Sequence, residues 1–238
     1  KNIYTKFIAK KKSCTIVKKR FVDHISKTKV LGVHSINDQP LSKKQRNEFN
    51  KLIVKNAKNH DLVIVSDYGH GLISKDSVKL IIKNSKFLAV NAQLNAANIG
   101  YHTISKYKRA DLIIINENEM RHELRNKIDN TDILIKSLSK KLKSKFIAVT
   151  SGNRGAKIYS RFSKKIISCP AFANKVADKI GTGDTMLALL TICIFKKINI
   201  NFSMLLAAFA AAENIKHMAN SVFVTKSKII KTVESYLK

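Results

Sequence analysis

Asp61-Leu62-Val63-Ile64-Val65-Ser66 is a short apolar run without the alternation of a half-exposed strand. A run of this kind, rich in β-branched residues, is typical of a strand buried on both faces of a parallel sheet. Similar runs recur at 87–90, 112–115 and 146–150, and helical spacing of apolar residues separates them at 74–83, 117–125 and 129–142. Alternating strands and helices predict an α/β fold, a doubly wound and mostly parallel sheet flanked by helices.

The same patterns predict the elements outside this region. They are strands at 3–9 and 14–17, a helix at 41–59 with Ser42 as N-cap, a hairpin at 156–160 and 165–168, and helices at 184–196, 202–218 and 226–237. The chain has no internal repeat and no linker rich in Pro, Gly or Ser. We therefore expect a single domain over residues 1–238.

The charge is strongly positive, with 45 Lys and Arg against 16 Asp and Glu, a net charge of +29. Only seven of the basic residues are Arg, which phosphate and base recognition favours, and the Lys residues are spread along the chain. Lys, Asn and Ile are enriched together, which indicates a compositional bias of the genome. We expect weak, salt-sensitive attraction to polyanions and no specific nucleic-acid partner, with a basic nucleic-acid-binding protein as the less favoured alternative.

The sequence also argues against a membrane protein and against a secreted protein. No apolar run approaches the ~20 residues of a spanning helix, so no membrane association is expected. The chain starts without Met and without a charged-then-apolar leader, which we interpret as a fragment rather than a secreted precursor. Its three cysteines have neither disulfide-framework nor metal-ligand spacing, which predicts free thiols and a cytoplasmic protein.

Glycine is scarce and clustered. Six of the eight glycines form three pairs, Gly69 with Gly71, Gly152 with Gly155, and Gly181 with Gly183. Glycine lets backbone amides approach a ligand closely, and α/β sheets bind ligands beyond the carboxyl ends of their strands. The pairs indicate a phosphate-bearing ligand; the alternative is that they only end strands.

The third pair lies in Asp178-Lys-Ile-Gly-Thr-Gly-Asp184, directly before an apolar helix. The amides of Gly181, Thr182 and Gly183 would converge at the helix N-terminus, where unpaired N–H groups and the macrodipole favour anions. Asp184 could then accept a proton from a hydroxyl while the amides hold the charge on a transferred phosphoryl group. The alternative for Asp184 is an ordinary N-cap, which would not require the preceding Gly-x-Gly.

Residues 178–184 resemble the Asp-x-x-Gly-(Ala/Thr)-Gly-Asp signature of the PfkB/ribokinase family of sugar kinases. Residues 116–119 resemble the family's Asn-x-x-Glu motif, and residues 150–155 resemble its Thr-x-Gly-x-x-Gly nucleotide loop. Residues 66–71 resemble the Asp-Tyr-Gly-Lys-Gly segment of the heptose 7-phosphate kinase branch, and residues 5–8 its lid strand. The resemblance covers nearly the whole chain and implies a ribokinase-like fold with a small β lid in residues 1–22.

The resemblance implies ATP-dependent phosphorylation of a sugar or sugar-phosphate hydroxyl in the presence of Mg²⁺. It makes Asp184 the base, Gly181, Thr182 and Gly183 the anion hole, and Asp178 a ligand of a monovalent cation such as K⁺, although Asp178 could also be a turn residue. It assigns the nucleotide to Asn116, Glu119, Thr150, Gly152, Gly155 and Asn214, with Glu119 holding Mg²⁺ through water. The alternative for Asn116 and Glu119 is a strand-end turn followed by a helix-starting Glu.

The substrate side departs from the family pattern. His70 replaces the usual Lys, and Val90-Asn91-Ala92-Gln93 replaces an Asp-Pro-Lys stretch, which removes two lysines that could touch a phosphorylated substrate. Asp67, Asn91 and Gln93 are the substrate-side candidates, and the amides of Asn91 and Gln93 can recognise sugar hydroxyls. The alternative for the amide-rich segment is a solvated loop.

The family's first part, which supplies most sugar contacts, has no match in this chain. One interpretation is a longer protein with a nucleotidyltransferase domain fused upstream, as in members of this subgroup. The other is a noncatalytic nucleotide- or sugar-binding remnant of such a kinase. Lid strands of this family often pair between subunits, which also implies a homodimer through the lid.

Overall fold

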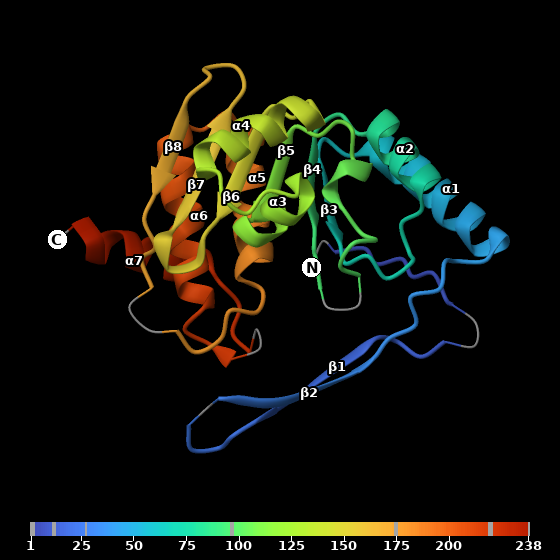
Figure 1. Ribbon diagram of the computed structural model, residues 1–238, viewed down its shortest axis with the longest axis horizontal. Helices are drawn as coiled ribbons and strands as arrows, with labels where there is room; N and C mark the ends of the chain where they lie inside the picture. The colour runs from blue at the N-terminus through green and yellow to red at the C-terminus, as the bar shows by residue number, and fades with distance from the viewer. Residues whose placement is uncertain are drawn as a thin grey trace.

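The computed structural model describes residues 3–10, 13–26, 28–95, 98–173, 176–218 and 221–237. Its centre is a six-stranded sheet in the order β3-β4-β5-β6-β7-β8 (Figure 1). The strands are β3 (Val63–Asp67), β4 (Leu88–Ala92), β5 (Leu112–Asn116), β6 (Phe146–Thr150), β7 (Ala156–Ser160) and β8 (Ile166–Cys169). Strands β3 to β6 run parallel, and β7 and β8 are antiparallel. The predicted α/β fold with a mostly parallel sheet is confirmed.

Helices cover both faces of the sheet (Figure 1). One layer contains α1 (Lys43–Asn59), α2 (Lys75–Asn84), α3 (Glu117–Leu124) and α4 (Thr131–Leu142), and the other contains α5 (Thr182–Phe195) and α6 (Ile200–Asn214). The last helix, α7 (Lys226–Leu237), is joined to α6 through the rings of Tyr236 and Phe209, whose centroids lie 4.9 Å apart. The two short 3₁₀ turns are η1 (Ile104–Lys106) and η2 (Gly152–Arg154).

Alternating side chains of the central strands fill two separate cores. On β5, Ile113 and Ile115 join the core under α1 to α4, whereas Leu112 and Ile114 join the core under α5 and α6. All four are at most 2% exposed, and each buried side chain of this size contributes about 1.5–3 kcal/mol relative to an exposed one. Burial on both faces explains why these strands are continuous apolar runs in the sequence.

The helix starts follow local capping chemistry. Ser42 is confirmed as the N-cap of α1, because its hydroxyl accepts the Gln45 N–H while the Gln45 side chain accepts the Ser42 N–H at 3.1 Å. The predicted helix at 202–218 begins at Ile200 and ends earlier than expected, at Asn214. Within the described residues, no helix combines the length and the apolarity needed to cross a bilayer.

The predicted N-terminal strands are wrong in position. Residues 3–10 form no strand, and residues 1, 2, 11 and 12 lie outside the described residues. The hairpin lies further along the chain, as β1 (Val17–Val22) and β2 (Lys29–Ser35). Asp23 builds the turn between them, since its Oδ1 accepts the N–H of Ser26 at 2.6 Å and its hydroxyl at 2.7 Å. This turn contains no Gly or Pro, the residues that most strongly mark a turn in a sequence.

Candidate active site

Four polar residues line the carboxyl ends of the parallel strands on the sheet face that α5 covers: Ser66, Asn91, Asn116 and Thr150. Ser66 is paired with Asn91 across β3 and β4, and Asn116 with Thr150 across β5 and β6. Asn116 and Thr150 each follow, by two positions, a buried residue of the α5–α6 core. Because alternate residues of a strand share a face, all four side chains lie on the side where α5 begins.

The first turn of α5 lacks the side-chain cap that other helices have. Gly181 is its N-cap in the left-handed conformation, with φ +76° and no capping side chain. Side chains cap α1 to α4 and α6: Ser42, Ser74, Asn116, Asn130 and Asn199. The first amides of a helix have no intrahelical acceptor, so those of Thr182 and Gly183 remain available to an anion. A Cβ on Gly183 would meet no atom within 4 Å.

Asp184 follows these amides and contacts the ends of two strands. Its Oδ1 accepts hydrogen bonds from the Ser66 hydroxyl at 3.0 Å and from the Gln93 amide at 3.5 Å, and its Oδ2 accepts one from the Tyr68 hydroxyl at 3.3 Å. Burial and the negative charge of Asp184 raise the pKa of Tyr68, so the phenol keeps its proton. Of the predicted site residues, the structure brings Asp184, Gln93 and the Gly181–Gly183 amides together.

Asn116 and Glu119 form a reciprocal capping box at the start of α3. The Asn116 side chain accepts the Glu119 N–H at 2.8 Å, and Glu119 Oε2 accepts the Asn116 N–H at 2.9 Å. Glu119 Oε1 accepts the N–H of Leu94 at 3.1 Å, which holds the loop that carries Gln93. Burial raises the pKa of Glu119. This geometry agrees with the alternative of a helix-starting Glu; the nucleotide and Mg²⁺ roles of both residues stay predictions.

The predicted nucleotide loop turns through η2 after Thr150. A Cβ on Gly155, which has φ +82°, would lie 2.1 Å from the Cys169 carbonyl oxygen, so the close approach to the end of β8 requires glycine. A Cβ on Gly152 would meet no atom within 4 Å. Of the two glycines, only Gly152 therefore has open space next to its Cα, where a ligand could approach the backbone.

Glu117, which the sequence motifs do not mark as functional, holds this loop. Its carboxylate accepts hydrogen bonds from the Ser151 hydroxyl and the Arg154 guanidinium, both at 2.7 Å, and from Arg121 at 2.8 Å. Burial acts to raise the pKa of Glu117, but the hydrogen bonds from Ser151 and Arg121 and the charge of Arg154 outweigh it, so the pKa is lowered. The only sequence signal was the Glu117–Arg121 pair at helical spacing.

Asn214 and a hollow of about 450 Å³ lie beside the first turn of α5. The Thr182 hydroxyl donates to Asn214 Oδ1 at 3.3 Å, which connects the start of α5 to the end of α6. Gly181, Asp184 and Asn214 line the hollow together with apolar residues that include Phe223. A volume of this size and a mainly apolar wall with a few polar groups are typical of small-molecule sites.

Two predicted residues have other contacts. Asp178 accepts the N–H of Ile180 at 3.2 Å in the turn before α5, and its role toward a monovalent cation stays a prediction. Asp67 is 3% exposed and points to the opposite sheet face from Ser66, where it accepts from Tyr107 and Lys106. The structure therefore does not bring Asp67 to Asp184, and its substrate-side role stays a prediction. Among the described residues, no cluster of three or more His, Cys, Asp or Glu is arranged to hold a metal.

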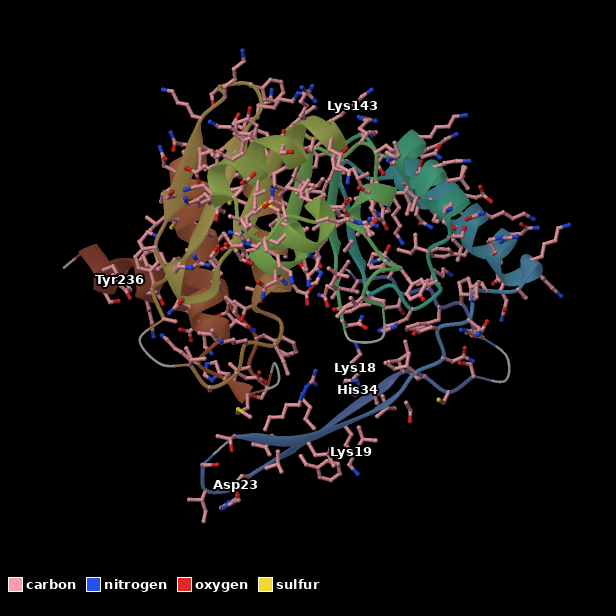
Figure 2. All side chains as sticks on the ribbon, viewed as in Figure 1. Lys18, Lys19, Asp23, His34, Lys143 and Tyr236 are labelled. Atoms are coloured by element: carbon pink, nitrogen blue, oxygen red, sulfur yellow. The ribbon has the colours of Figure 1, made fainter. Side chains whose placement is uncertain are left out.

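The β1–β2 hairpin lies across the open end of this site. Lys18 Nζ is 5.6 Å from the centre of the Tyr68 ring. Lys18 is paired with His34, and Figure 2 shows both between the hairpin and the body of the protein, with Lys19 on the far side. The inner face of the hairpin therefore places the Lys18 ammonium next to Tyr68, one of the residues that contact Asp184.

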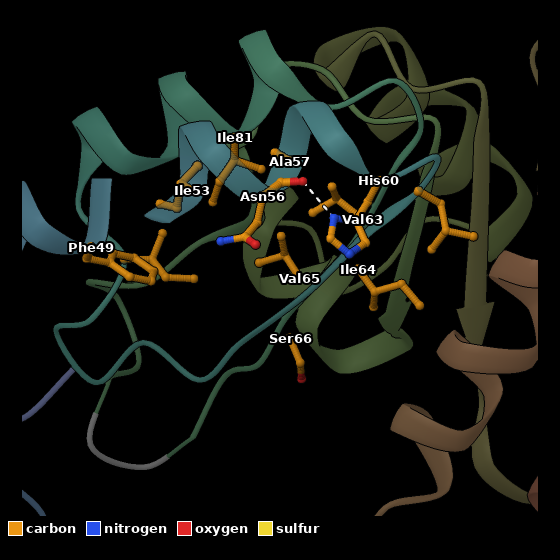
Figure 3. A pocket seen from close by; sticks show the side chains of 12 residues that line it. Phe49, Ile53, Asn56, Ala57, His60, Val63, Ile64, Val65, Ser66 and Ile81 are labelled. Atoms are coloured by element: carbon orange, nitrogen blue, oxygen red, sulfur yellow. Dashed lines mark hydrogen bonds between the residues drawn. The ribbon is translucent and has the colours of Figure 1, made fainter. Parts of the chain in front are cut away.

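A second hollow of about 420 Å³ lies between α1 and the edge strand β3 (Figure 3). Its wall is mainly apolar, with Phe49 and Ile53 on α1, and it reaches Ser66. His60 Nδ1 bonds the main-chain carbonyl of Asn56 at 2.7 Å, and the Asn56 side-chain amide donates to the Leu52 carbonyl at 2.8 Å. We assign no chemistry to this hollow.

Comparison with known proteins identifies the family. Residues 22–224 match the model of the pfkB family of carbohydrate kinases, and the chain belongs to this family. It is 32% identical over 156 residues to the bifunctional protein HldE of Campylobacter fetus, covering 64% of this chain and 33% of the relative. It is 27% identical over 230 residues to the bifunctional protein HldE of Helicobacter pylori strain G27, covering 93% of this chain and 47% of the relative. The chain thus spans a third to a half of these relatives' length.

Solved structures agree with the fold. Phosphofructokinase-2 from Escherichia coli, in complex with potassium, superposes with a TM-score of 0.69 at 12% identity, covering 87% of this chain and 67% of that chain. Ribokinase from Giardia lamblia gives a TM-score of 0.68 at 18% identity, covering 93% of this chain and 73% of that chain. The ribokinase-like fold expected from the sequence motifs is confirmed.

Proposed function

We propose that this chain carries the phosphoryl-transfer site of a kinase that moves the γ-phosphoryl group of ATP to a hydroxyl of a sugar or sugar phosphate. The observation that carries the proposal is the position of Asp184 in the first turn of α5, directly after amides that no side chain caps. Anion-binding amides and a carboxylate within one helical turn are the two parts that this reaction needs. Membership of the pfkB family supports the same reaction class.

Asp184 acts as the base in the proposed reaction. It takes the proton of the acceptor hydroxyl as that oxygen attacks the γ-phosphorus, and the bond from the γ-phosphorus to the bridging oxygen of ADP breaks. The amides of Gly181, Thr182 and Gly183 hold the charge on the transferred group. The Ser66 and Tyr68 hydroxyls orient the carboxylate through their bonds to its two oxygens.

The nucleotide is assigned to the hollow beside α5 and to the loop after β6. Asn214 lines that hollow, Thr150 is the last residue of β6, and Gly152 and Gly155 lie in the loop that follows. Asn116 and Glu119 supply oxygen donors suited to Mg²⁺, which in nucleotide sites keeps several waters and is held by few protein groups. Bound there with the nucleotide, Mg²⁺ would neutralise phosphate charge. Asp178, in the turn before α5, would contribute to a monovalent cation site such as one for K⁺.

The sugar is assigned to the carboxyl ends of β3 and β4. The Asn91 side-chain amide donates to the Ile114 carbonyl at 2.9 Å, while its Oδ1 is buried without a partner among the described residues. A buried amide oxygen without a partner needs a hydrogen-bond donor, which a substrate hydroxyl would supply. Gln93 adds a second amide beside Asp184.

The proposal extends to two partners. The first is a nucleotidyltransferase domain fused upstream, because the matched relatives are bifunctional and the chain spans only part of their length. The second is another copy of the chain, paired through the outer face of the β1–β2 hairpin. That face carries apolar side chains that are about half exposed: Val17, Phe21, Leu31 and Val33.

Asp184→Asn tests the proposed reaction. The substitution keeps the size of the side chain and removes the base, so turnover of ATP with a sugar acceptor should fall about 10²–10⁴-fold while calorimetry still detects ATP binding. The matched control is Asp61→Asn, which changes the same charge at an exposed position at the opposite end of β3. Unchanged turnover in Asp184→Asn would contradict the assignment, and ATP binding without transfer in the wild type would favour the noncatalytic remnant.

A further inference from the structure

Asp67 is the centre of a buried polar network behind the site. Its Oδ2 accepts the Tyr107 hydroxyl at 2.6 Å and the Lys106 ammonium at 2.5 Å, and its Oδ1 accepts the Gly69 N–H at 3.0 Å. The Asp67 carboxylate is 4% exposed, and Tyr107 is fully buried. A buried carboxylate with a cation and two further donors is held in one orientation, because any other leaves charges unpaired.

The main chain of Asp67 is anchored as well. Its carbonyl oxygen accepts the N–H of Gln93 at 2.9 Å and a ring N–H of His102 at 3.1 Å. The pKa of His102 is lowered, because the effect of its desolvation outweighs the opposing effect of the Asp67 charge. The ring is therefore neutral and donates through its N–H. Asp67 thus joins the end of β3 to the end of β4 and to the segment 102–107.

The residues on either side of Asp67 point to the opposite face of the sheet. Ser66 and Tyr68 both donate to Asp184, and the side chain of Gln93, whose main chain bonds Asp67, donates to it too. All three donors to Asp184 are therefore adjacent to Asp67 in the chain or hydrogen-bonded to it. Asp67 makes no hydrogen bond to Asp184. Instead, Asp67 fixes the backbone of the residues whose side chains donate to Asp184.

We propose that Asp67 is a positioning residue for phosphoryl transfer, which acts by holding Ser66, Tyr68 and Gln93 against Asp184 rather than by binding substrate. This inference rests on the proposed function, in which Asp184 is the base. Small displacements of a reacting group reduce turnover strongly, by up to about 10²-fold for 1 Å. The network on the α1–α4 side of the sheet thereby sets the geometry on the α5 side.

The test compares three variants of the whole chain. Asp67→Asn keeps the shape but removes the charge that Lys106 pairs with, and Tyr107→Phe removes one hydroxyl donor and is the milder change. The matched control is Asp111→Asn. Asp111 is also buried, paired with Lys145 at 2.6 Å and bonded to the Leu88 N–H at 2.8 Å, but it lies at the amino ends of β4 and β5.

Two readouts separate positioning from substrate binding and from loss of folding. The first is kcat and KM for transfer from ATP to the sugar acceptor. The second is the resonance of Tyr68 in protein labelled with [¹³Cζ]tyrosine, assigned with Tyr68→Phe; it reports the Tyr68–Asp184 hydrogen bond without any turnover. If the wild type transfers no phosphoryl group, the proposed function fails, and the resonance still decides whether Asp67 holds Tyr68 against Asp184.

We expect Asp67→Asn to lower kcat about 10–100-fold with little change in KM, and to shift the Tyr68 resonance. Tyr107→Phe should lower kcat and shift the Tyr68 resonance in the same directions but by smaller amounts. Asp111→Asn should change only the stability of the protein. A rise in sugar KM with an unmoved resonance would make Asp67 a substrate contact and overturn the proposal. An Asp67→Asn variant that matches Asp111→Asn in both readouts would overturn it as well.

Discussion

The Tyr68 hydroxyl donates a hydrogen bond of 3.3 Å to Oδ2 of Asp184, a residue 116 positions further along the chain. The bond connects the carboxyl end of β3 to the first turn of α5. Ser66 donates to the other oxygen of the same carboxylate, so two hydroxyls from one strand end fix its orientation. The carboxylate thereby faces the strand ends where a substrate hydroxyl would lie.

Tyr68→Phe should lower kcat without loss of fold. The substitution removes the donor to Oδ2 and keeps the ring beneath Lys18. A hydrogen bond to a charged group contributes about 1.5–3 kcal/mol, so kcat should fall about tenfold or more. The control is Tyr101→Phe, at a tyrosine that is 94% exposed. Equal steady-state rates for the two variants would show that the Tyr68 hydroxyl does not orient Asp184, the proposed base.

Gly183→Ala should separate binding of the phosphoryl group from folding. Gly183 is helical, and an added Cβ would meet no atom of the protein within 4 Å. The variant should be as stable as the wild type or up to about 1 kcal/mol more stable, because alanine favours helix over glycine. A methyl group beside the amides proposed to bind the phosphoryl group should nevertheless lower kcat/KM for ATP. Thermal unfolding and steady-state kinetics measure the two effects, and a stable variant with full activity would exclude these amides from the site.

The central strands of the sheet could be predicted because burial on both faces leaves a continuous apolar run, as in residues 112–115; the edge strand β3 has the same kind of run, although its Ile64 is 38% exposed. The β1–β2 hairpin could not be located in the same way. All of its strand residues except Lys18 are exposed, so no pattern of burial marks the two strands, and its turn depends on the Asp23 side chain. The predicted location of the hairpin strands along the chain was therefore wrong, whereas the predicted locations of the sheet strands were right.

The candidate site was predictable only where its chemistry is local in sequence. Gly181 to Asp184 lie within one helical turn, and the spacing alone indicates an anion site with a carboxylate. Tyr68 and Glu117 act through contacts with residues distant in the chain, which no local pattern reports. For Glu119, the local pattern allowed two interpretations, a helix-starting Glu and a residue that holds Mg²⁺. The structure shows the capping box of the first, and the second stays a prediction.

Glu117→Gln should destabilise the protein in a pH-dependent way. The folded-state pKa of Glu117 is lowered, so the contribution of its carboxylate to stability is present above the unfolded pKa and is lost as the pH falls through the folded pKa. Urea unfolding should therefore show the largest difference between variant and wild type near neutral pH. The difference should shrink below about pH 4, near the ordinary pKa of Glu. A difference that stays constant down to acidic pH would mean that the charge of Glu117 does not stabilise the loop after β6.

Phe21→Asp should prevent the proposed pairing of two copies through the hairpin. Phe21 lies on the outer face of β1, opposite Leu31, and is 45% exposed, with Val17 and Val33 on the same face. Burying a carboxylate in an apolar interface is costly, so light scattering after size exclusion should give a dimer for the wild type and a monomer for Phe21→Asp. Phe162→Asp is the control, because Phe162 is 71% exposed in the turn between β7 and β8, away from the hairpin. A wild-type monomer, or equal dissociation of both variants, would contradict pairing through this face.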